Sequence, residues 1–328
     1  MAIDDPQVQA GVFGVALPAF SGAIGAGLGW LIAGRRDKKL AEAGSSFDED
    51  MKQSPRADAL LALGLGGAFA VASLGLVGVP DTWPRAMSEW MLPIVAAGTV
   101  AAIVPGLIGR GLPSAVVRWL LRAGFVAGLL AWPLANTRSN HWEGAEAAAW
   151  MAGVAAWLLL SFAAMDRVAT RLPRAMVCVV LGLSVAGLIP VVFGAGVTAQ
   201  PQVSGGLAAG IGVAGVVALI SRGIVPLVGA GGVVVAWLAS TMFVGWPFVA
   251  DMAWWEVGLS ASLPVLAALP TLVPGLSKRR AAAGWIAVAL VAGATAGVSA
   301  RHVPDLVSEL TGSGQGSDLD DLYEMYGS

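Results

Sequence analysis

Charged residues are scarce in this chain of 328 residues. Asp, Glu, Lys and Arg together make up 12% of it, whereas 57% is hydrophobic and the mean hydropathy is +0.76. Soluble globular domains carry about 25% charged residues, so much of the apolar surface of this chain must face lipid. The shortage excludes an ordinary water-soluble domain and indicates an integral membrane protein.

Residues that bind metals and cofactors are equally scarce. The chain has two histidines, His141 and His302, and one cysteine, Cys178. A bis-histidine haem pair within the helices, an iron–sulfur cluster or a cysteine-rich zinc site needs more ligands than these. The net charge of −2 provides no basic surface for nucleic acid. We therefore expect no metal, no cofactor and no nucleic-acid partner.

Catalytic motifs are missing as well. The sequence contains no HExxH, no Walker lysine loop and no GxSxG. One GxGxxG match, at residues 210–215, lies inside an apolar run rather than between a strand and a helix, so helix packing is its expected role. The sequence therefore predicts a protein that is not an enzyme.

What the chain does have is a series of long runs without charged residues. The hydrocarbon core is about 30 Å thick and a helix rises 1.5 Å per residue, so about 20 residues cross it. The sixth of nine runs is 47 residues long and is divided by a turn signal, Gln200-Pro201-Gln202. We predict an all-α polytopic membrane protein with about ten transmembrane helices, at residues 9–34, 59–79, 91–109, 119–136, 147–165, 175–196, 204–220, 224–244, 253–275 and 282–300.

Short loops favour antiparallel packing of helices that follow one another in the chain. We expect five such hairpins within a single transmembrane domain of residues 1–300, with a cytoplasmic linker at 35–58 and a flexible acidic tail at 301–328. Glycines four residues apart allow close helix contacts. We expect these contacts inside the monomer, with a face between two copies as the second use, for Gly25 and Gly29, Gly206 and Gly210, and Gly293 and Gly297.

The positive charges predict the orientation, because Lys and Arg are retained on the cytoplasmic side of a membrane. With ten spans, only Arg85, Arg138 and Arg301 lie on one side. The other side holds sixteen basic residues: Arg35, Arg36, Lys38, Lys39, Lys52, Arg56, Arg110, Arg118, Arg122, Arg167, Arg171, Arg174, Arg222, Lys278, Arg279 and Arg280. This asymmetry predicts a cytoplasmic-type inner membrane with both termini extracytoplasmic.

Charged residues near the middle of the bilayer are costly and are usually functional. With these spans, no carboxylate, lysine or arginine lies near mid-bilayer, and Arg118 and Arg122 are expected to reach the headgroups from the first turn of their helix. Glu256 comes closest, about one turn inside the ninth span. The pattern argues against proton or sodium coupling and leaves passive transport open.

Tryptophans gather with acids and histidines on the predicted outer side. Aromatic rings beside carboxylates can hold a cation, an amine or a sugar face, although the same pattern is also typical of an interfacial aromatic belt. The ninth span adds three prolines, which can bend a helix beside a substrate site. If a substrate vestibule exists, we expect it to include Trp254, Trp255, Glu256, Asp251, His141 and Glu143.

The end of the chain contains its only two tyrosines. Leu319, Leu322, Tyr323 and Tyr326 fall at helical spacing, so a helix over 318–328 would present one apolar stripe surrounded by acids. Such a segment can dock into a partner's groove. An unstructured acidic tail is an equally good interpretation.

Two functional hypotheses follow. The first is a permease or carrier-like protein for an unknown small solute or lipid-linked molecule, with an outward-facing aromatic and acidic vestibule. The alternative is a non-catalytic structural or scaffold subunit of a membrane protein complex, which docks a partner through residues 318–328. Both place the protein in contact with the lipid bilayer, and neither excludes a homo-oligomer.

Overall fold

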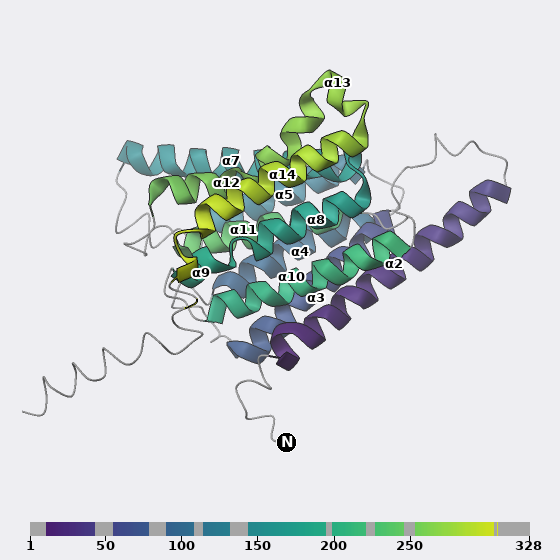
Figure 1. Ribbon diagram of the computed structural model, residues 1–328, viewed down its shortest axis with the longest axis horizontal. Helices are drawn as coiled ribbons and strands as arrows, with labels where there is room; N and C mark the ends of the chain where they lie inside the picture. Colours follow the sequence, from purple (N-terminus) through teal and green to yellow (C-terminus); the bar gives the residue numbers. More distant parts are fainter. Residues whose placement is uncertain are drawn as a thin grey trace, which may run out of the picture.

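The computed structural model describes residues 11–42, 55–78, 90–107, 114–131, 144–194, 199–220, 227–245, 253–304 and 307. Every regular element of these residues is a helix, and the helices lie side by side along one common direction (Figure 1). In chain order they are η1 (Val12–Ala16), α2 (Leu17–Glu42), α3 (Pro55–Leu76), α4 (Met91–Leu107), α5 (Ser114–Ala131), α7 (Gly144–Arg171), α8 (Arg174–Ala186), α9 (Ile189–Gly194), α10 (Ala199–Ile220), α11 (Val228–Gly245), α12 (Trp254–Leu272), α13 (Pro274–Ser277) and α14 (Arg280–Ser299).

Seven of the described helical segments are long and apolar enough to cross a membrane: Val12–Ile32, Arg56–Leu76, Gly144–Arg171, Arg174–Val191, Pro201–Ile220, Trp254–Leu272 and Arg280–Ser299. Met91–Pro105 and Val228–Met242 are shorter apolar helices. The prediction of an all-helical membrane protein is therefore confirmed. The count of ten spans stays a prediction, although each of the ten predicted ranges contains a described helix.

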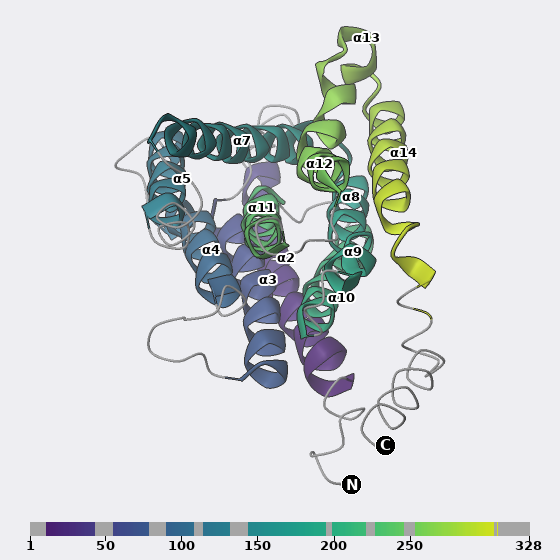
Figure 2. The ribbon, with the colours of Figure 1, turned by 90° about the vertical axis from the view of Figure 1, so that its left-hand side faces the viewer.

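α11 forms the centre of the bundle. Figure 2 looks nearly along α11 and shows it surrounded by other helices. Every residue of α11 from Val228 to Met242 is buried, and Trp237, its largest side chain, is fully enclosed. The Trp237 indole N–H donates to Ser204 Oγ of α10 at 3.1 Å, so its polar atom is satisfied in the apolar interior. A helix that is apolar on every side suits either lipid or a protein interior, and α11 lies in the protein interior.

Glycines bring α2 into close contact with two other helices. A methyl group on Gly25 would lie 2.7 Å from the Gly64 Cα of α3, and one on Gly22 would lie 2.6 Å from the Gly210 carbonyl oxygen of α10. The predicted contacts at Gly25 and Gly210 therefore lie inside the monomer, as do those at Gly29 and Gly206. The third predicted pair differs, because Gly293 and Gly297 of α14 have no other residue within 4 Å of an added methyl group.

Consecutive helices pack together in only part of the bundle. α2 packs on α3, and α4 packs on α5, as predicted for hairpins. α12 also packs directly on α14, to which α13 connects it in the chain. α7 and α8 touch only slightly, and α11 packs against α3, α4 and α7, whereas α10 packs against α2, α3 and α8. For α10 and α11 the hairpin prediction is therefore not confirmed. Both helices pack mainly against helices that are distant in the chain.

Contacts between distant helices also give their relative directions. Trp157 of α7 contacts Ala261 of α12, and Arg167 contacts Thr271, so both contacts join residues 104 apart and the two helices run parallel. α8 and α14 are also parallel, since Gly187 lies beside Thr295 and Gly284 beside Met176. α2 and α3 are antiparallel because Gly25 meets Gly64 while Gly29 meets Ala57. These directions match a chain that reverses at every predicted span.

Several helix boundaries differ from the predicted ones. α2 continues through the basic residues to Glu42 and α3 begins at Pro55, so the 35–58 segment is helical at both ends. α10 begins at Ala199, because Pro201 lies in its first turn, where proline is tolerated.

The sixth predicted span is interrupted at Gly187 and Leu188, where α8 ends and α9 begins. Pro190 cannot donate a backbone hydrogen bond there. Beside this break, the Ser299 hydroxyl of α14 donates to the carbonyl of Gly187.

The ninth predicted span was expected to bend most sharply at its prolines. α12 continues as a helix through Pro264 and Pro270 and ends at Leu272, so the span is broken only at the third of these prolines, Pro274. The break comes at Val273, which is extended at φ −79° and ψ 116°, as the residue before Pro274 tends to be. The short α13 that follows projects beyond the rest of the bundle (Figures 1 and 2).

Candidate functional site

A cluster of charged side chains joins α5 to α7 at one end of the bundle, which we call the Arg122 end. Arg122 Nη1 and Nη2 donate to Asp166 Oδ2 and Oδ1 at 2.8 and 2.7 Å. Arg118, one turn earlier in α5, lies 3.5 Å from Asp166 Oδ2. Two parallel hydrogen bonds between a guanidinium and a carboxylate are among the strongest polar contacts in proteins.

Arg122 is buried, with 4% of its surface exposed. Its guanidinium carbon lies 4.8 Å from the centre of the Phe162 ring and 5.1 Å from that of Trp119, so cation–π attraction adds to the ion pair. The expectation that Arg122 reaches the headgroups was wrong for this reason. A counter-charge and two aromatic faces inside the protein replace the water that the guanidinium gives up.

Asp58 lies at the same end, in the first turn of α3. Its side chain is buried, and Oδ1 accepts a hydrogen bond of 3.1 Å from the backbone N–H of Val228 at the start of α11. A helix N-terminus carries partial positive charge and favours a carboxylate. Gly229 fits against the Asp58 carbonyl, where a methyl group would lie only 2.6 Å from the oxygen. Asp58 thus fixes the central helix to α3.

A partly open recess lies between these groups. Its cavity volume is about 30 Å³, and it is lined by Asp58, Gly98, Ala101, Ala102, Pro105, Arg118, Arg122, Phe162, Val228, Gly229 and Gly232. Along α4 it extends from Pro105 to Gly98, seven residues or about 10 Å of helix. Small residues leave the space open, while Arg118, Arg122 and Asp58 supply charge of both signs. In this form the recess has room for one or two water molecules beside the charged groups, so a larger solute needs the helices around it to move apart.

The opposite end, which we call the Glu256 end, contains a second charged group. Glu256 is fully buried in the first turn of α12, where Oε2 accepts the Ala253 N–H at 2.8 Å. Oε1 lies 3.2 Å from His302 Nε2 and 3.5 Å from Arg301 Nη1, both of which follow α14. Neither Oε1 nor Nε2 makes a hydrogen bond with another described residue. The separation suits an ion pair, but the atoms are not aligned for a hydrogen bond.

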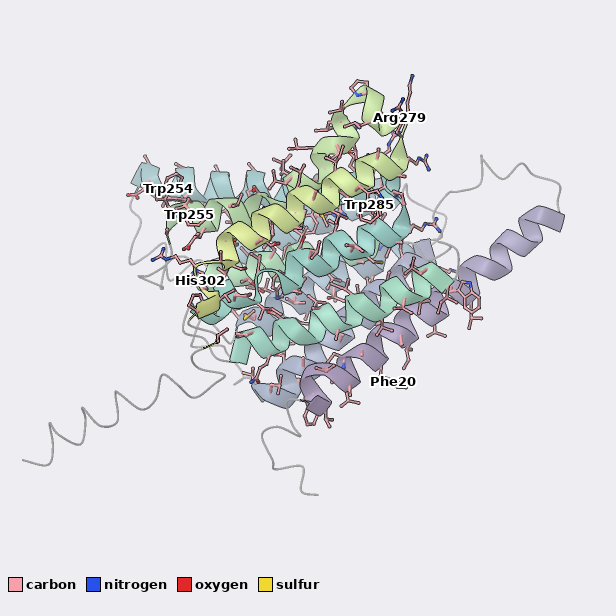
Figure 3. The ribbon with its side chains drawn as sticks, in the orientation of Figure 1. Phe20, Trp254, Trp255, Arg279, Trp285 and His302 are labelled. Carbon is pink, nitrogen blue, oxygen red and sulfur yellow. The ribbon has the colours of Figure 1, made fainter. Side chains whose placement is uncertain are left out.

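The structure brings together only some of the predicted vestibule residues. Trp254 and Trp255 lie beside the Glu256 end, 82% and 40% exposed, with His302 nearby, while Arg279 lies at the other end of the bundle (Figure 3). Glu256 turns inward, away from the exposed Trp254. The remaining predicted members, Asp251, His141 and Glu143, lie outside the described residues. The four residues predicted to dock a partner also lie outside them: Leu319, Leu322, Tyr323 and Tyr326.

Sequence reasoning missed the recess and most of its polar residues. Asp58 falls in the predicted linker at 35–58, and Asp166 directly follows the predicted span at 147–165, where neither was expected to form a site. A signal was present, because Arg118 and Arg122 share one helix face four residues apart and Asp166 ends the next span at the same membrane side. His302, the partner of Glu256, gave no such signal, because it lies 46 residues away in the chain.

Known proteins provide no relative from which a role could be transferred. A comparison with protein-family models found no match to this chain, and comparisons with the curated proteins and with the solved structures found none either.

Proposed function

We propose that this chain is a carrier-like membrane permease that binds a small polar solute in the recess at the Arg122 end. The observation that carries the proposal is the recess itself, which extends about 10 Å along α4 and contains both cationic and anionic side chains. Pockets that bind small molecules combine apolar walls with a few polar groups. The proposal includes no catalytic role, because the sequence contains none of the catalytic motifs sought.

The contact between Arg118 and Asp166 is the weaker one in the charged cluster, so a solute group can take the place of Asp166. Arg118 is 3.5 Å from Asp166, whereas Arg122 makes two short hydrogen bonds to the same carboxylate. A carboxylate or hydroxyl of the solute can replace Asp166 as the partner of Arg118 while the Arg122 pair stays intact. Asp58, at the opposite wall, can accept from a solute amine or hydroxyl. These groups favour a small zwitterion or polyol over a large apolar molecule.

The proposal places the Arg122 end at the cytoplasmic side of a ten-span bundle, with both termini outside. The relative helix directions support this topology, since α7 and α12 are parallel and are both odd-numbered predicted spans. The described structure then represents the form whose recess opens inward. Trp254, Trp255 and Glu256, with Asp251, His141 and Glu143, remain the proposed outer vestibule. A reporter fused at Lys52 should be cytoplasmic and one fused after Ser328 extracytoplasmic; the reverse result would overturn the orientation.

Thiol accessibility tests the recess without knowledge of the solute. Cys178 is the chain's one cysteine and is buried in α8, so Cys178→Ala gives a cysteine-free background. Ala102→Cys, which lines the recess, should react with a membrane-impermeant thiol reagent. Ala236→Cys in α11 is the matched control, because Ala236 is fully buried against Gly98 and lies outside the recess lining.

The scaffold alternative predicts the opposite pattern. If Ala102→Cys reacts no faster than Ala236→Cys in folded protein, the recess is not reached by water and the carrier proposal fails. Loss of a co-purifying partner on deletion of 318–328 would then favour a structural subunit that docks through Leu319, Leu322, Tyr323 and Tyr326.

A further inference from the structure

Four buried side-chain atoms in the described part of the chain lack a hydrogen-bond partner: Ser161 Oγ, Ser260 Oγ, Glu256 Oε1 and His302 Nε2. Other buried hydroxyls bond to backbone carbonyls of their own helix, as those of Ser184 and Thr295 do. Buried polar groups are almost always satisfied, so each exception calls for a water or an ion. All four belong to α7, α12 and the residues that follow α14.

The four atoms can be ordered along the bundle. Ser260 follows Glu256 by four residues in α12, about 6 Å of helix. Because α7 and α12 run parallel with contacts between residues 104 apart, Ser161 lies level with residue 265, five residues or about 8 Å beyond Ser260. Phe162, the next residue of α7, lines the recess. The four atoms are thus spread along the bundle from Glu256 toward the level of the recess.

The groups around Glu256 indicate whether its open oxygen atom binds a metal cation or a proton. Its Oε2 already accepts the Ala253 N–H, which leaves Oε1 as the open atom. The Arg301 guanidinium and the His302 imidazole face Oε1 at 3.5 and 3.2 Å, and the guanidinium repels a metal cation. The described residues contain no group of three His, Cys, Asp or Glu side chains that could hold a metal ion, whereas a proton needs only Oε1 and Nε2, which are 3.2 Å apart. The pair is therefore suited to bind a proton.

Other ionisable groups near the pair are few. On the packed elements that are described, α7 contributes the exposed Glu146 in its first turn, while α9 and α11 contain no ionisable residue. Arg174 and Cys178 of α8 lie toward the opposite end, since α8 runs parallel to α14 and begins level with its first turn. Arg301 is therefore the one charged side chain of these elements in contact with the pair.

We infer that Glu256 and His302 form a proton-binding site at the extracytoplasmic end, with water at Ser260 and Ser161 continuing it toward the recess. Once rotation of the imidazole or the carboxylate aligns the two atoms, the proton moves from His302 Nε2 to Glu256 Oε1, which leaves a neutral imidazole and a carboxylic acid, and it then passes to the water beside Ser260. This site would couple proton entry to the movement of the solute. The coupling and the assignment of the site to the extracytoplasmic side both rest on the proposed function. The sequence argued against such coupling, because only the fold shows that Glu256 is enclosed.

Infrared difference spectroscopy on the full chain in lipid nanodiscs tests the site directly. A pH step should produce a carboxylic-acid band that Glu256→Gln abolishes and that Glu146→Gln, at an exposed position, leaves unchanged. His302→Asn removes the imidazole, so the imidazole bands that accompany the carboxylic-acid band in wild type should disappear. This second variant keeps the test valid if Glu256→Gln fails to fold.

Two results would overturn the inference. One is a pH-difference spectrum that is identical in wild type and Glu256→Gln; the other is a spectral response to sodium in place of protons. Ser260→Ala should leave the band in place but reduce the signal from internal water, whereas Ser262→Ala, whose hydroxyl bonds to Leu259 of its own helix, should not. Because labelling at Ala102→Cys does not depend on protons, failure of this site and failure of the recess can be distinguished.

Discussion

The two ends of the bundle hold their charged groups in opposite ways. At the Arg122 end, Asp166 and Arg122 form a bidentate pair with short hydrogen bonds and two aromatic neighbours. At the Glu256 end, Oε1 and His302 Nε2 are 3.2 Å apart but make no hydrogen bond. A fully bonded pair fixes helices in place, whereas an incompletely bonded one can gain and lose a proton without breaking the fold. The first pair fixes α5 to α7, and the second pair is suited to the gain and loss of a proton.

The largest effect is expected from Asp166→Ala. This substitution leaves the Arg122 guanidinium buried without a counter-charge, which typically destabilises a protein by about 3 kcal/mol or more. Equilibrium unfolding in mixed detergent micelles would measure the loss, with Glu146→Gln as an exposed control. A loss of unfolding free energy no larger than that of the control would show that the pair does not hold α5 and α7 together.

Gly229→Ala should weaken the contact between α3 and α11 at the same end. The added methyl group would lie 2.6 Å from the backbone oxygen of Asp58, and overpacking of this kind costs about 1–3 kcal/mol. Gly124→Ala in α5 is the matched control, because open space surrounds that position and alanine favours the helix. Equal unfolding free energies for the two variants would contradict the close contact.

Glu256→Gln should change stability much less than Asp166→Ala does. The glutamine amide oxygen can still accept the Ala253 N–H, and no hydrogen bond from His302 or Arg301 is lost, so we expect a change below about 1 kcal/mol. The same unfolding assay measures it. A loss of unfolding free energy as large as that of Asp166→Ala would mean that the charged groups stabilise the fold equally at both ends, which would remove the contrast between them.

Arg301→Gln should have the smallest effect. The guanidinium is more than half exposed, and exposed ion pairs contribute about 0–1 kcal/mol. Thermal unfolding at low and high salt should therefore differ little between this variant and wild type. A clear, salt-dependent loss of stability would show that Arg301 stabilises the Glu256 end more than its exposure indicates.

The sequence predicted the membrane-spanning helices well because the cost of placing charge in lipid acts on each segment locally. The same holds for Gly25 and Gly210, whose missing side chains permit close contacts wherever a neighbour comes near. Gly293 shows the limit, since the spacing alone cannot tell which face of α14 meets another helix.

The sequence could not predict which side chains of distant helices would pair with each other. Arg122 meets Asp166 and Glu256 meets His302 only because of the order in which helices surround α11. That order depends on how well side chains fill the interior, and the apolar pattern of α11 is the same on every face. The recess follows from the same packing, so no local motif marks Gly98 or Gly232 as its lining.

The carrier proposal depends most on which side of the membrane reaches the recess. On the Cys178→Ala background, an impermeant thiol reagent can be applied to inside-out and right-side-out vesicles that contain either Ala102→Cys or the exposed Trp254→Cys. We expect Ala102→Cys to react in inside-out vesicles and Trp254→Cys in right-side-out ones. Reaction of both cysteines from the same side, or of Ala102→Cys from neither, would contradict a recess that opens to the cytoplasm.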